Sequence, residues 1–289
     1  FAQGGASTLF AQIPANLMNG FDSACYLDTG AWSTKAIKEA KKYGQINVVA
    51  SSKAQNYQTV PAFSSFDLDE NAAYLHLCPN ETIGGLEFSE LPETSLPIVA
   101  DLSSTILSRK IDVSKYGMIY AGAQKNVGPA GVVICIVRKD LLARSAETLP
   151  TTWNFATLAK NDSMINTPPT FAIYLADLVF EWLENQGGVE AIEQANIRKA
   201  EALYRAIDES SFYSNPIDPA YRSRMNVPFV LADDSLEALF LEESEAAGLR
   251  TLAGHRSVGG MRASIYNAMP MEGVQALIDF MHSFEQRHG

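Results

Sequence analysis

The middle of the chain contains the segment Met118-Ile-Tyr-Ala-Gly-Ala-Gln-Lys-Asn-Val-Gly-Pro-Ala-Gly-Val-Val-Ile-Cys-Ile-Val137. Two apolar runs of strand length flank a lysine and a Gly/Pro-rich turn. Continuous apolar runs are typical of strands that are covered on both faces. Small residues beside Lys125 leave room for a flat ligand, and functional side chains of parallel sheets collect at the carboxyl ends of the strands. The segment therefore predicts a buried sheet with a candidate site at Lys125.

Similar apolar runs recur along the first two-thirds of the chain and alternate with helical patterns. Besides Met118–Ala121 and Gly131–Val137, strands are expected at Gln45–Ala50, Ala73–Cys78 and Ile98–Asp101, and helices at Thr8–Met18 and Ser33–Tyr43. Such alternation predicts a largely parallel, doubly wound α/β sheet.

A helix expected at Thr170–Glu184 is apolar almost all round, so it is either buried or at a subunit interface. Pro168-Pro169 precede this helix and Gly187-Gly188 follow it, as is usual at helix ends. We therefore expect a large domain at residues 1–186 and a small C-terminal α+β domain at residues 187–289. Its expected elements are helices at Val189–Asp208, Ser235–Ala247 and Glu272–Gln286, and strands at Asn226–Ala232 and Met261–Tyr266.

Composition excludes several classes of function. The chain has 289 residues, 47% of them hydrophobic, and a formal net charge of −11, which argues against a general binder of nucleic acid or of anionic membranes. The longest apolar runs are of strand length, so no membrane span is expected. Cys25, Cys78 and Cys135 are far apart in apolar stretches, which predicts free thiols and a cytoplasmic protein. The four histidines show no metal-binding spacing, and no metal is expected.

Asp101 ends the apolar strand Ile98–Asp101, well before Lys125 in the chain. A buried carboxylate needs a cationic partner, which could be Lys125 or the protonated nitrogen of a pyridine cofactor. A partly desolvated lysine can act as a nucleophilic amine and form an imine. Two simpler interpretations stay open, because a lone loop lysine is usually a solvated charge and an aspartate after a strand is often a helix N-cap.

Several segments, in order and over essentially the whole chain, resemble the phosphoserine aminotransferase family. They are Cys78-Pro-Asn-Glu-Thr-Ile-Gly-Gly85, Asp101-Leu-Ser-Ser-Thr-Ile-Leu-Ser108, Tyr120-Ala-Gly-Ala-Gln-Lys-Asn126, Asn166-Thr-Pro-Pro-Thr170 and Gly254-His-Arg-Ser-Val-Gly-Gly-Met-Arg-Ala-Ser-Ile-Tyr-Asn267, together with Arg224-Met-Asn-Val-Pro-Phe229 and Ala36-Ile-Lys-Glu-Ala-Lys-Lys-Tyr43. The resemblance implies a fold-type I enzyme that uses pyridoxal 5'-phosphate and forms a homodimer with its sites at the subunit interface. It implies amino transfer between glutamate and 3-phosphohydroxypyruvate, giving phosphoserine and 2-oxoglutarate in serine biosynthesis.

The resemblance also assigns roles around the cofactor ring. Lys125 would carry the cofactor as a Schiff base and move the Cα proton of the substrate. Asp101 would pair with the pyridinium nitrogen and keep the ring an electron sink. Trp32 would stack on the ring, and Thr82 would bind its phenolic oxygen. A core aromatic and a turn threonine are the simpler interpretations of these last two residues.

The cofactor phosphate would be held by residues from two subunits. Ala6 and Ser7 would offer donors just before the helix at Thr8, because main-chain amides at a helix start suit an anion. Gln124 is the third expected phosphate ligand. Asn166 and Thr167 would reach the phosphate from the neighbouring subunit, although Asn-Thr-Pro-Pro is also typical of a turn that starts a helix.

Three cations match the positions that bind substrate in the family. Arg262 would grip the α-carboxylate with its guanidinium, and His255 and Arg256 would face the phosphate of the substrate. Without the resemblance, all three would be interpreted as solvated surface charges.

Two features depart from the family pattern. Ser7 stands where some members have arginine, which implies a weaker or rearranged phosphate contact. The chain also starts at Phe1-Ala-Gln-Gly-Gly without a methionine, as though an N-terminal segment with a further His-Arg pair were absent. Such an absence would impair substrate binding more than cofactor binding.

Other functions remain open on the sequence. One is another fold-type I activity, such as a different aminotransferase or a desulfurase-like enzyme, although no cysteine lies in an evident catalytic loop. The other is a shortened, non-catalytic dimer that holds the cofactor without turnover.

Overall fold

The computed structural model describes residues 1–289 and is built on a seven-stranded sheet of order β1-β9-β8-β7-β4-β2-β3. The strands of this sheet are β1 (Ala2–Gly4), β2 (Ser23–Asp28), β3 (Gln45–Ser51), β4 (Leu75–Leu77), β7 (Ile98–Asp101), β8 (Met118–Gly122) and β9 (Gly131–Val137). Neighbouring strands are parallel except at β9, which runs antiparallel to β8 and to β1. The predicted, mainly parallel α/β sheet is therefore confirmed.

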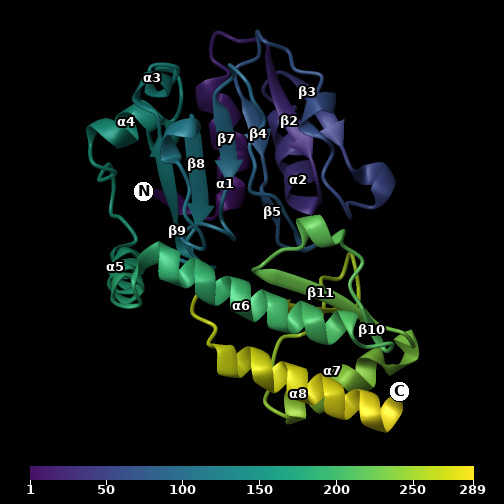
Figure 1. Ribbon diagram of the computed structural model, residues 1–289. Helices are drawn as coiled ribbons and strands as arrows, with labels where there is room; N and C mark the ends of the chain where they lie inside the picture. The colour runs from purple at the N-terminus through teal and green to yellow at the C-terminus, as the bar shows by residue number, and fades with distance from the viewer.

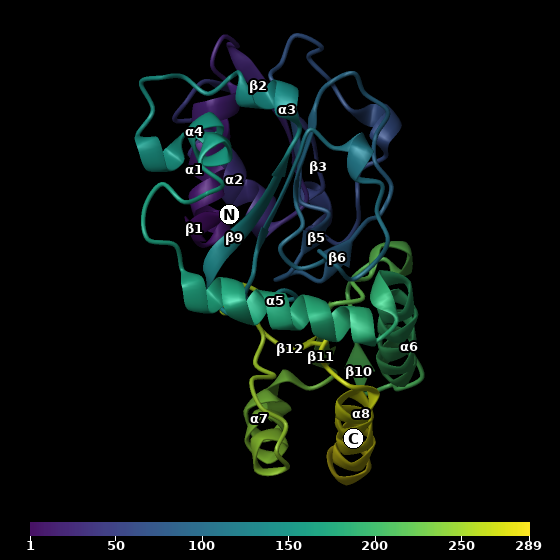
Figure 2. The ribbon, with the colours of Figure 1, turned by 90° about the vertical axis from the view of Figure 1, so that its left-hand side faces the viewer.

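Helices cover one face of this sheet, and loops with a short hairpin lie over the other (Figure 2). The covering helices are α1 (Ala6–Leu17), α2 (Ala31–Ala40), α3 (Lys139–Leu142) and α4 (Phe155–Lys160), and the hairpin strands are β5 (Asn80–Glu81) and β6 (Leu86–Glu87). Alternate strand residues point to opposite faces, so each strand contributes to two cores. Val99 and Met118 pack with α1 and α2, whereas Ile98 and Ile119 belong to the core on the opposite face.

The remaining elements form a smaller module below the sheet (Figure 1). They are α6 (Gly188–Asp208), β10 (Tyr213–Ser214), β11 (Asn226–Leu231), α7 (Glu237–Ala246), β12 (Met261–Ser264) and α8 (Met271–His288), and β11 is the middle strand of an antiparallel sheet. A separate core of 20 buried residues holds this module together, and its members lie between Ala200 and Phe284. Separate cores are expected of separate domains, and the boundary between residues 186 and 187 stays a proposal.

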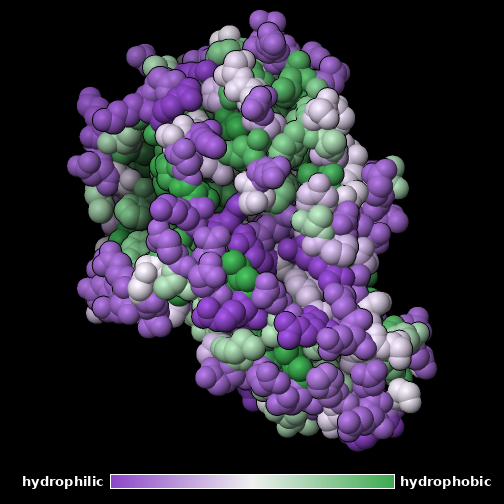
Figure 3. Space-filling model, viewed as in Figure 1, coloured by the Kyte–Doolittle hydropathy of each residue, from purple (hydrophilic) through white to green (hydrophobic).

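Helix α5 (Thr170–Asn185) connects the two parts of the chain. It is not buried within one chain, because Phe171 is 70% exposed and Tyr174 is 58% exposed. Burial of the whole helix within one chain is therefore not observed, and its place at a subunit interface stays a prediction. In the space-filling view, apolar side chains also gather over β8 and β9, whereas the surface over α6 and α8 is mostly hydrophilic (Figure 3). No helix is both long enough and apolar enough to cross a membrane.

Some elements differ from the sequence prediction. The central strand β2 was not predicted, because polar Ser23 and Asp28 shorten its apolar run to four residues. Helix α1 begins at Ala6 rather than Thr8, and the expected helix at Ser33–Tyr43 begins at Ala31 and ends at Ala40. The expected helix at Ser235–Ala247 starts as a tight turn. Turns of this 3-10 type lie at Lys53–Gln55, Phe63–Ser65, Val113–Lys115, Thr151–Trp153, Pro219–Tyr221 and Asp234–Leu236. All three cysteines are free, as predicted.

Candidate active site

A small pocket of about 110 Å³ lies where β4, β7 and β8 end and α1 and α2 begin. Carboxyl ends of parallel strands and amino ends of helices are the usual place for a ligand in such a fold. The pocket is lined by Gly5, Ala6, Ser7, Phe10, Trp32, Cys78, Asn80, Thr82, Asp101, Ser103, Ser104, Gln124 and Lys125. Most of the residues expected to hold the cofactor therefore converge on one pocket, although they come from distant parts of the chain.

Lys125 lies just after β8, and its amine points across the pocket. The Lys125 Nζ donates to the Thr82 hydroxyl at 2.6 Å and lies 5.5 Å from the centre of the Trp32 ring. Burial lowers the pKa of the Lys125 ammonium, and the nearby Asp101 carboxylate opposes part of that shift. A lowered pKa favours the neutral, nucleophilic amine that imine chemistry needs.

Asp101 is the last residue of β7, and its side chain is 6% exposed. Its Oδ1 accepts hydrogen bonds from the Ser103 amide at 2.9 Å and from the Ser103 hydroxyl at 2.6 Å. Burial raises the pKa of the Asp101 carboxyl, whereas the Ser103 bonds and the Lys125 charge lower it. The sequence left open whether this residue is a helix N-cap, and no helix starts here. The carboxylate therefore remains available to a cation in the pocket.

The first turn of α1 forms another wall of the pocket. Gly5 is the N-cap and has no side chain to satisfy the first amides, and no acidic residue occupies the first turn. The amides of Ala6 and Ser7 belong to this turn, whose partial positive charge suits an anion. The sequence placed these two residues just before the helix, whereas they form its first turn, and their role as phosphate ligands stays a prediction.

Helix α2 carries Trp32 into the pocket, and a residue not predicted for the site holds it there. The buried carboxylate of Glu81 accepts from the Trp32 amide at 2.8 Å, the Ser33 amide at 2.9 Å and the Ser33 hydroxyl at 2.7 Å. Glu81 thus satisfies amides at the start of α2 in place of Gly30, the N-cap, which has no side chain. A Cβ on Gly30 would lie 2.6 Å from the Glu81 carboxyl carbon, so glycine is needed at this close approach.

Other pocket residues were also missed by the sequence reasoning. Asn80 lies in the segment Cys78–Gly85, and Ser103 and Ser104 directly follow Asp101. Their proximity to predicted residues is a usable signal. Phe10 has no such signal, because its position depends on how α1 packs against the sheet.

The expected substrate cations are only partly brought to this pocket. Arg262 of β12 is not among the lining residues but lies beside one of them, since its Nη1 donates to the Thr82 carbonyl at 3.4 Å and its charge contributes to lowering the pKa of Lys125. The buried Nε of Arg262 has no partner. His255 and Arg256 do not line the pocket, and the His255 Nδ1 instead lies 2.7 Å from the Ser257 hydroxyl.

Two expected phosphate ligands also lie outside the pocket of their own chain. Gln3 Nε2 donates to Asn166 Oδ1 at 2.8 Å and to the Thr167 carbonyl at 2.9 Å. Neither residue lines the pocket. Their expected role requires a second subunit and stays a prediction.

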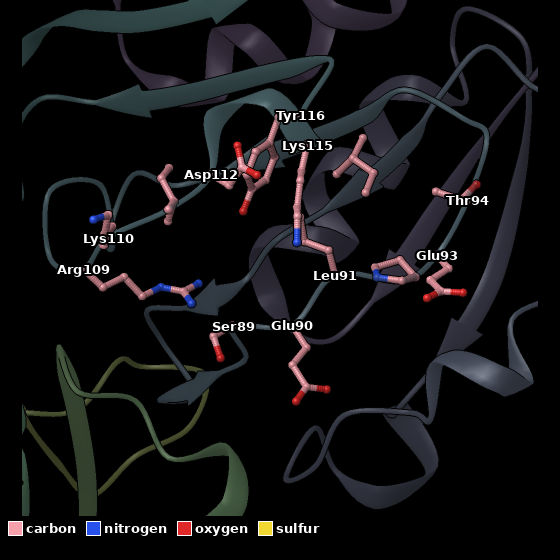
Figure 4. Close-up of a pocket in the computed structure, with 13 residues that line it drawn as sticks. Ser89, Glu90, Leu91, Glu93, Thr94, Arg109, Lys110, Asp112, Lys115 and Tyr116 are labelled. Atoms are coloured by element: carbon pink, nitrogen blue, oxygen red, sulfur yellow. The ribbon is translucent and has the colours of Figure 1, made fainter.

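A larger cavity, of about 700 Å³, lies elsewhere and contains none of the predicted residues. Figure 4 shows the Arg109 guanidinium and the Lys115 amine pointing toward its interior. Its lining holds three basic and three acidic side chains: Arg109, Lys110, Lys115, Glu90, Glu93 and Asp112. Since these charges balance, the cavity shows no preference for an anion or a cation, and the chemistry converges on the smaller pocket instead.

Comparison with known proteins identifies the family of the chain. The family described as aminotransferase class-V matches residues 1–277. The phosphoserine aminotransferases of Marinomonas sp. (strain MWYL1) and Pseudomonas aeruginosa (strain PAO1) are 83% and 57% identical to the chain, and each alignment covers 100% of this chain and 80% of the relative.

Solved structures give the same result. The phosphoserine aminotransferase from Bacillus circulans subsp. alkalophilus is 50% identical, with a TM-score of 0.98 over 100% of this chain and 80% of that one. A phosphoserine aminotransferase with bound pyridoxal phosphate, from Trichomonas vaginalis, is 43% identical, with a TM-score of 0.93 over 97% of this chain and 81% of that one.

Proposed function

This chain belongs to the class-V aminotransferase family, and from that membership we propose that the pocket at Lys125 carries out phosphoserine transamination. The reaction moves an amino group between glutamate and 3-phosphohydroxypyruvate and gives phosphoserine and 2-oxoglutarate. The chain is a transaminase that depends on pyridoxal 5'-phosphate, with the fold of the fold-type I enzymes. The observation that supports the site is the convergence of Lys125, Asp101 and Trp32 on one pocket.

The residues of the pocket suit each part of pyridoxal phosphate. The start of α1 offers amides for a phosphate, Trp32 offers an aromatic face for a ring, and Lys125 offers an amine for an aldehyde. The Lys125 amine is hydrogen-bonded to Thr82, so the buried Asp101 carboxylate is left to face a second cation such as a pyridinium nitrogen. When bound, the cofactor supplies a conjugated ring that accepts the electron pair left at the substrate Cα.

We assign Lys125 two roles, as the point of covalent attachment and as the group that moves the Cα proton. Its lowered pKa increases the fraction of neutral amine at neutral pH, and an amine in that form can accept a proton at Nζ. Thr82 accepts a hydrogen bond from the same nitrogen and so orients it. Burial of the amine also excludes competing water.

We assign Asp101 the role of holding positive charge at the far side of the ring. The two Ser103 hydrogen bonds and the Lys125 charge oppose the effect of burial on its pKa, so they favour the carboxylate form. A charged Asp101 keeps a proton on the ring nitrogen, which is the condition for electron withdrawal from Cα.

Arg262 is the residue that we assign to the substrate carboxylate. It comes from the small module, lies beside Thr82, and carries a buried Nε without a partner. A guanidinium with free donors binds a carboxylate through two parallel hydrogen bonds. His255 and Arg256 are proposed for the substrate phosphate, from a position outside the pocket of one chain.

We also propose a homodimer with shared sites. Phe171, Tyr174 and Leu178 leave an apolar face of α5 exposed by 70%, 58% and 41%, and a patch of this kind is typical of an interface. A second subunit would also give Asn166 and Thr167 a phosphate to bind. Sedimentation velocity tests the dimer. The cytoplasmic location that the free cysteines predict is a separate proposal.

A coupled assay with glutamate and 3-phosphohydroxypyruvate tests the function. Formation of phosphoserine supports the proposal. The bound cofactor should also absorb visible light, and borohydride should shift this absorbance. A peptide map should then place the reduced cofactor on Lys125. Turnover of other amino acids without phosphoserine would exclude this substrate. Full cofactor occupancy without any turnover would instead support a non-catalytic dimer.

A further inference from the structure

A row of polar side chains lies behind Asp101, on the sheet face that packs against α1 and α2. Asp101 of β7 is the register partner of Tyr120 in β8, Val99 is the partner of His76 in β4, and His76 is the partner of Tyr26 in β2. Register partners in a parallel sheet, and residues two positions apart in one strand, point to the same face. Tyr26, His76 and Tyr120 therefore lie in a row across β2, β4 and β8, and Asp101 of the intervening strand β7 lies on the same face.

The members of this row contact one another and are shielded from water. The His76 Nε2 lies 2.8 Å from the Tyr120 hydroxyl, and both side chains are at most 1% exposed. The Tyr26 ring stacks on the imidazole, with 4.7 Å between ring centres and 19° between planes. The Tyr26 hydroxyl is held in turn by the Tyr74 hydroxyl at 2.7 Å. The imidazole thus has one polar partner, Tyr120, and one stacking partner.

The direction of the hydrogen bonds follows from a count of donors. The Nδ1 of His76 is buried and has no partner. If Nδ1 carried the proton, a buried N–H would be left unpaired and the Tyr120 hydroxyl would be used up as the donor to Nε2. If Nε2 carries the proton, it donates to the Tyr120 oxygen, and the Tyr120 proton is free to point to Asp101. The second arrangement makes more hydrogen bonds and leaves no buried donor unpaired.

We propose that His76 and Tyr120 are positioning residues that deliver a hydrogen bond to Asp101 and keep its carboxylate charged. This inference rests on the proposed role of Asp101 opposite the ring nitrogen. Tyr120 is the register partner of Asp101 across the strand pair, so both side chains lie on the same face of the sheet, and a hydrogen bond from the Tyr120 hydroxyl would lower the pKa of the carboxyl. Together with the two hydrogen bonds from Ser103, this would give the carboxylate three hydrogen bonds to offset its burial.

The side chains of the row are uncharged at neutral pH. Burial lowers the pKa of His76 to about 3, and the groups that face the imidazole are the Tyr120 hydroxyl and the Tyr26 ring, whose own hydroxyl is bonded to Tyr74. Burial raises the pKa of each of these three tyrosines. No charge therefore appears in the row at neutral pH, and its donors keep one direction.

The test compares Tyr120→Phe with Tyr74→Phe. Both variants lose one buried hydroxyl from the same face of the sheet, but Tyr74 bonds only to Tyr26 and not to the row members that reach Asp101. The first measurement is an infrared titration of the Asp101 carboxyl in cofactor-free protein, identified by subtraction of the Asp101→Asn variant. We expect the pKa to rise by about one unit in Tyr120→Phe, since a hydrogen bond to a charged group contributes about a factor of ten, and to stay unchanged in Tyr74→Phe.

The second measurement uses the loaded enzyme. Tyr120→Phe should lower kcat by about tenfold with little change in the KM for glutamate, because the carboxylate acts only on the ring. His76→Gln, whose amide can still donate to Tyr120, should retain more activity than His76→Leu. The His76 pair keeps the test valid if Tyr120→Phe does not fold.

The outcomes separate this inference from the proposed function. Equal Asp101 titrations in Tyr120→Phe and Tyr74→Phe, or a nitrogen NMR spectrum with the His76 proton on Nδ1, would overturn the role of the row. A wild-type chain that does not transaminate would overturn the proposed function. The titration of the Asp101 carboxyl would still show whether Tyr120 donates a hydrogen bond to it.

Discussion

Removing the Glu81 side chain should loosen the start of α2 and, with it, the position of Trp32. Glu81 is 1% exposed and accepts three hydrogen bonds from the first turn of the helix. In Glu81→Ala, the amides of Trp32 and Ser33 lose their carboxylate acceptor. An unpaired buried donor costs about 1–3 kcal/mol, and loss of a helix cap costs about 0.5–2 kcal/mol.

These contributions overlap, so we expect the free energy of unfolding to fall by about 3 kcal/mol. A change of this size in a chain of 289 residues corresponds to a decrease in Tm of roughly 6 °C. Burial raises the pKa of Glu81, and the bonds from Ser33 and Trp32 lower it, so the helix start compensates part of the cost of the buried charge. The affinity for pyridoxal phosphate should fall as well, because the Trp32 ring lines the pocket.

Circular dichroism during heating gives the Tm, and quenching of tryptophan fluorescence during a cofactor titration gives the affinity. Asn154→Ala is the matched control, because Asn154 caps α4 by accepting from the Thr157 amide at 2.8 Å and lies outside the pocket. The control should lose stability but keep its cofactor affinity. A Glu81→Ala protein that melts like the wild type, or that binds the cofactor equally well, would refute the capping role of Glu81.

Four further predictions concern single side chains. Lys125→Ala should abolish the half-reaction with glutamate while the circular dichroism spectrum stays native; retained activity would show that another amine holds the cofactor. Asp101→Asn should slow the transfer of the Cα proton in stopped-flow absorbance by about a hundredfold or more, as loss of a key electrostatic group does, and an unchanged rate would remove its role. His76 has a folded pKa of about 3 against an ordinary value of 6.5, so the unfolded chain binds a proton first as the pH falls. The difference in free energy of unfolding between the wild type and His76→Gln, measured by urea denaturation, should therefore decrease by about 1.4 kcal/mol for each pH unit from pH 6.5 toward pH 3. A constant difference would contradict the neutral state of His76 in the folded protein. Lys199→Met should cost roughly 3 kcal/mol in the same assay, because the buried Lys199 amine donates to three carbonyls of the segment Ile265–Met269 at 2.8–3.1 Å; a loss below 1 kcal/mol would show that water replaces it.

Local patterns were sufficient for much of the fold. The apolar runs at Ile98–Asp101 and Gly131–Val137 coincide with β7 and β9, because an apolar run bounded by turn residues carries its own signal. The same reasoning placed Lys125 and Asp101 at strand ends. Strand β2 was not predicted by this pattern, because its burial depends on its neighbours β3 and β4 rather than on its own short apolar run.

The resemblance to a family identified most pocket residues, but not the groups that support them. Glu81 acts on Trp32 across 49 positions, and Tyr120 meets His76 across 44 positions. Neither pairing has a local pattern, because both depend on which strands lie side by side and in which register. Arg262 is a stronger case, since it reaches Thr82 across 180 positions and from the other module.

Chain order and residue type alone indicated a parallel sheet, an amine at the end of one strand and an acid at the end of another. Only the packed molecule determined that this amine points to Thr82, that the acid accepts a hydrogen bond from the Ser103 hydroxyl, and that a glutamate holds the helix of Trp32. The reason is physical: apolar periodicity acts over a few neighbouring residues, whereas hydrogen-bond partners and pKa values are set by groups that meet after the chain has folded.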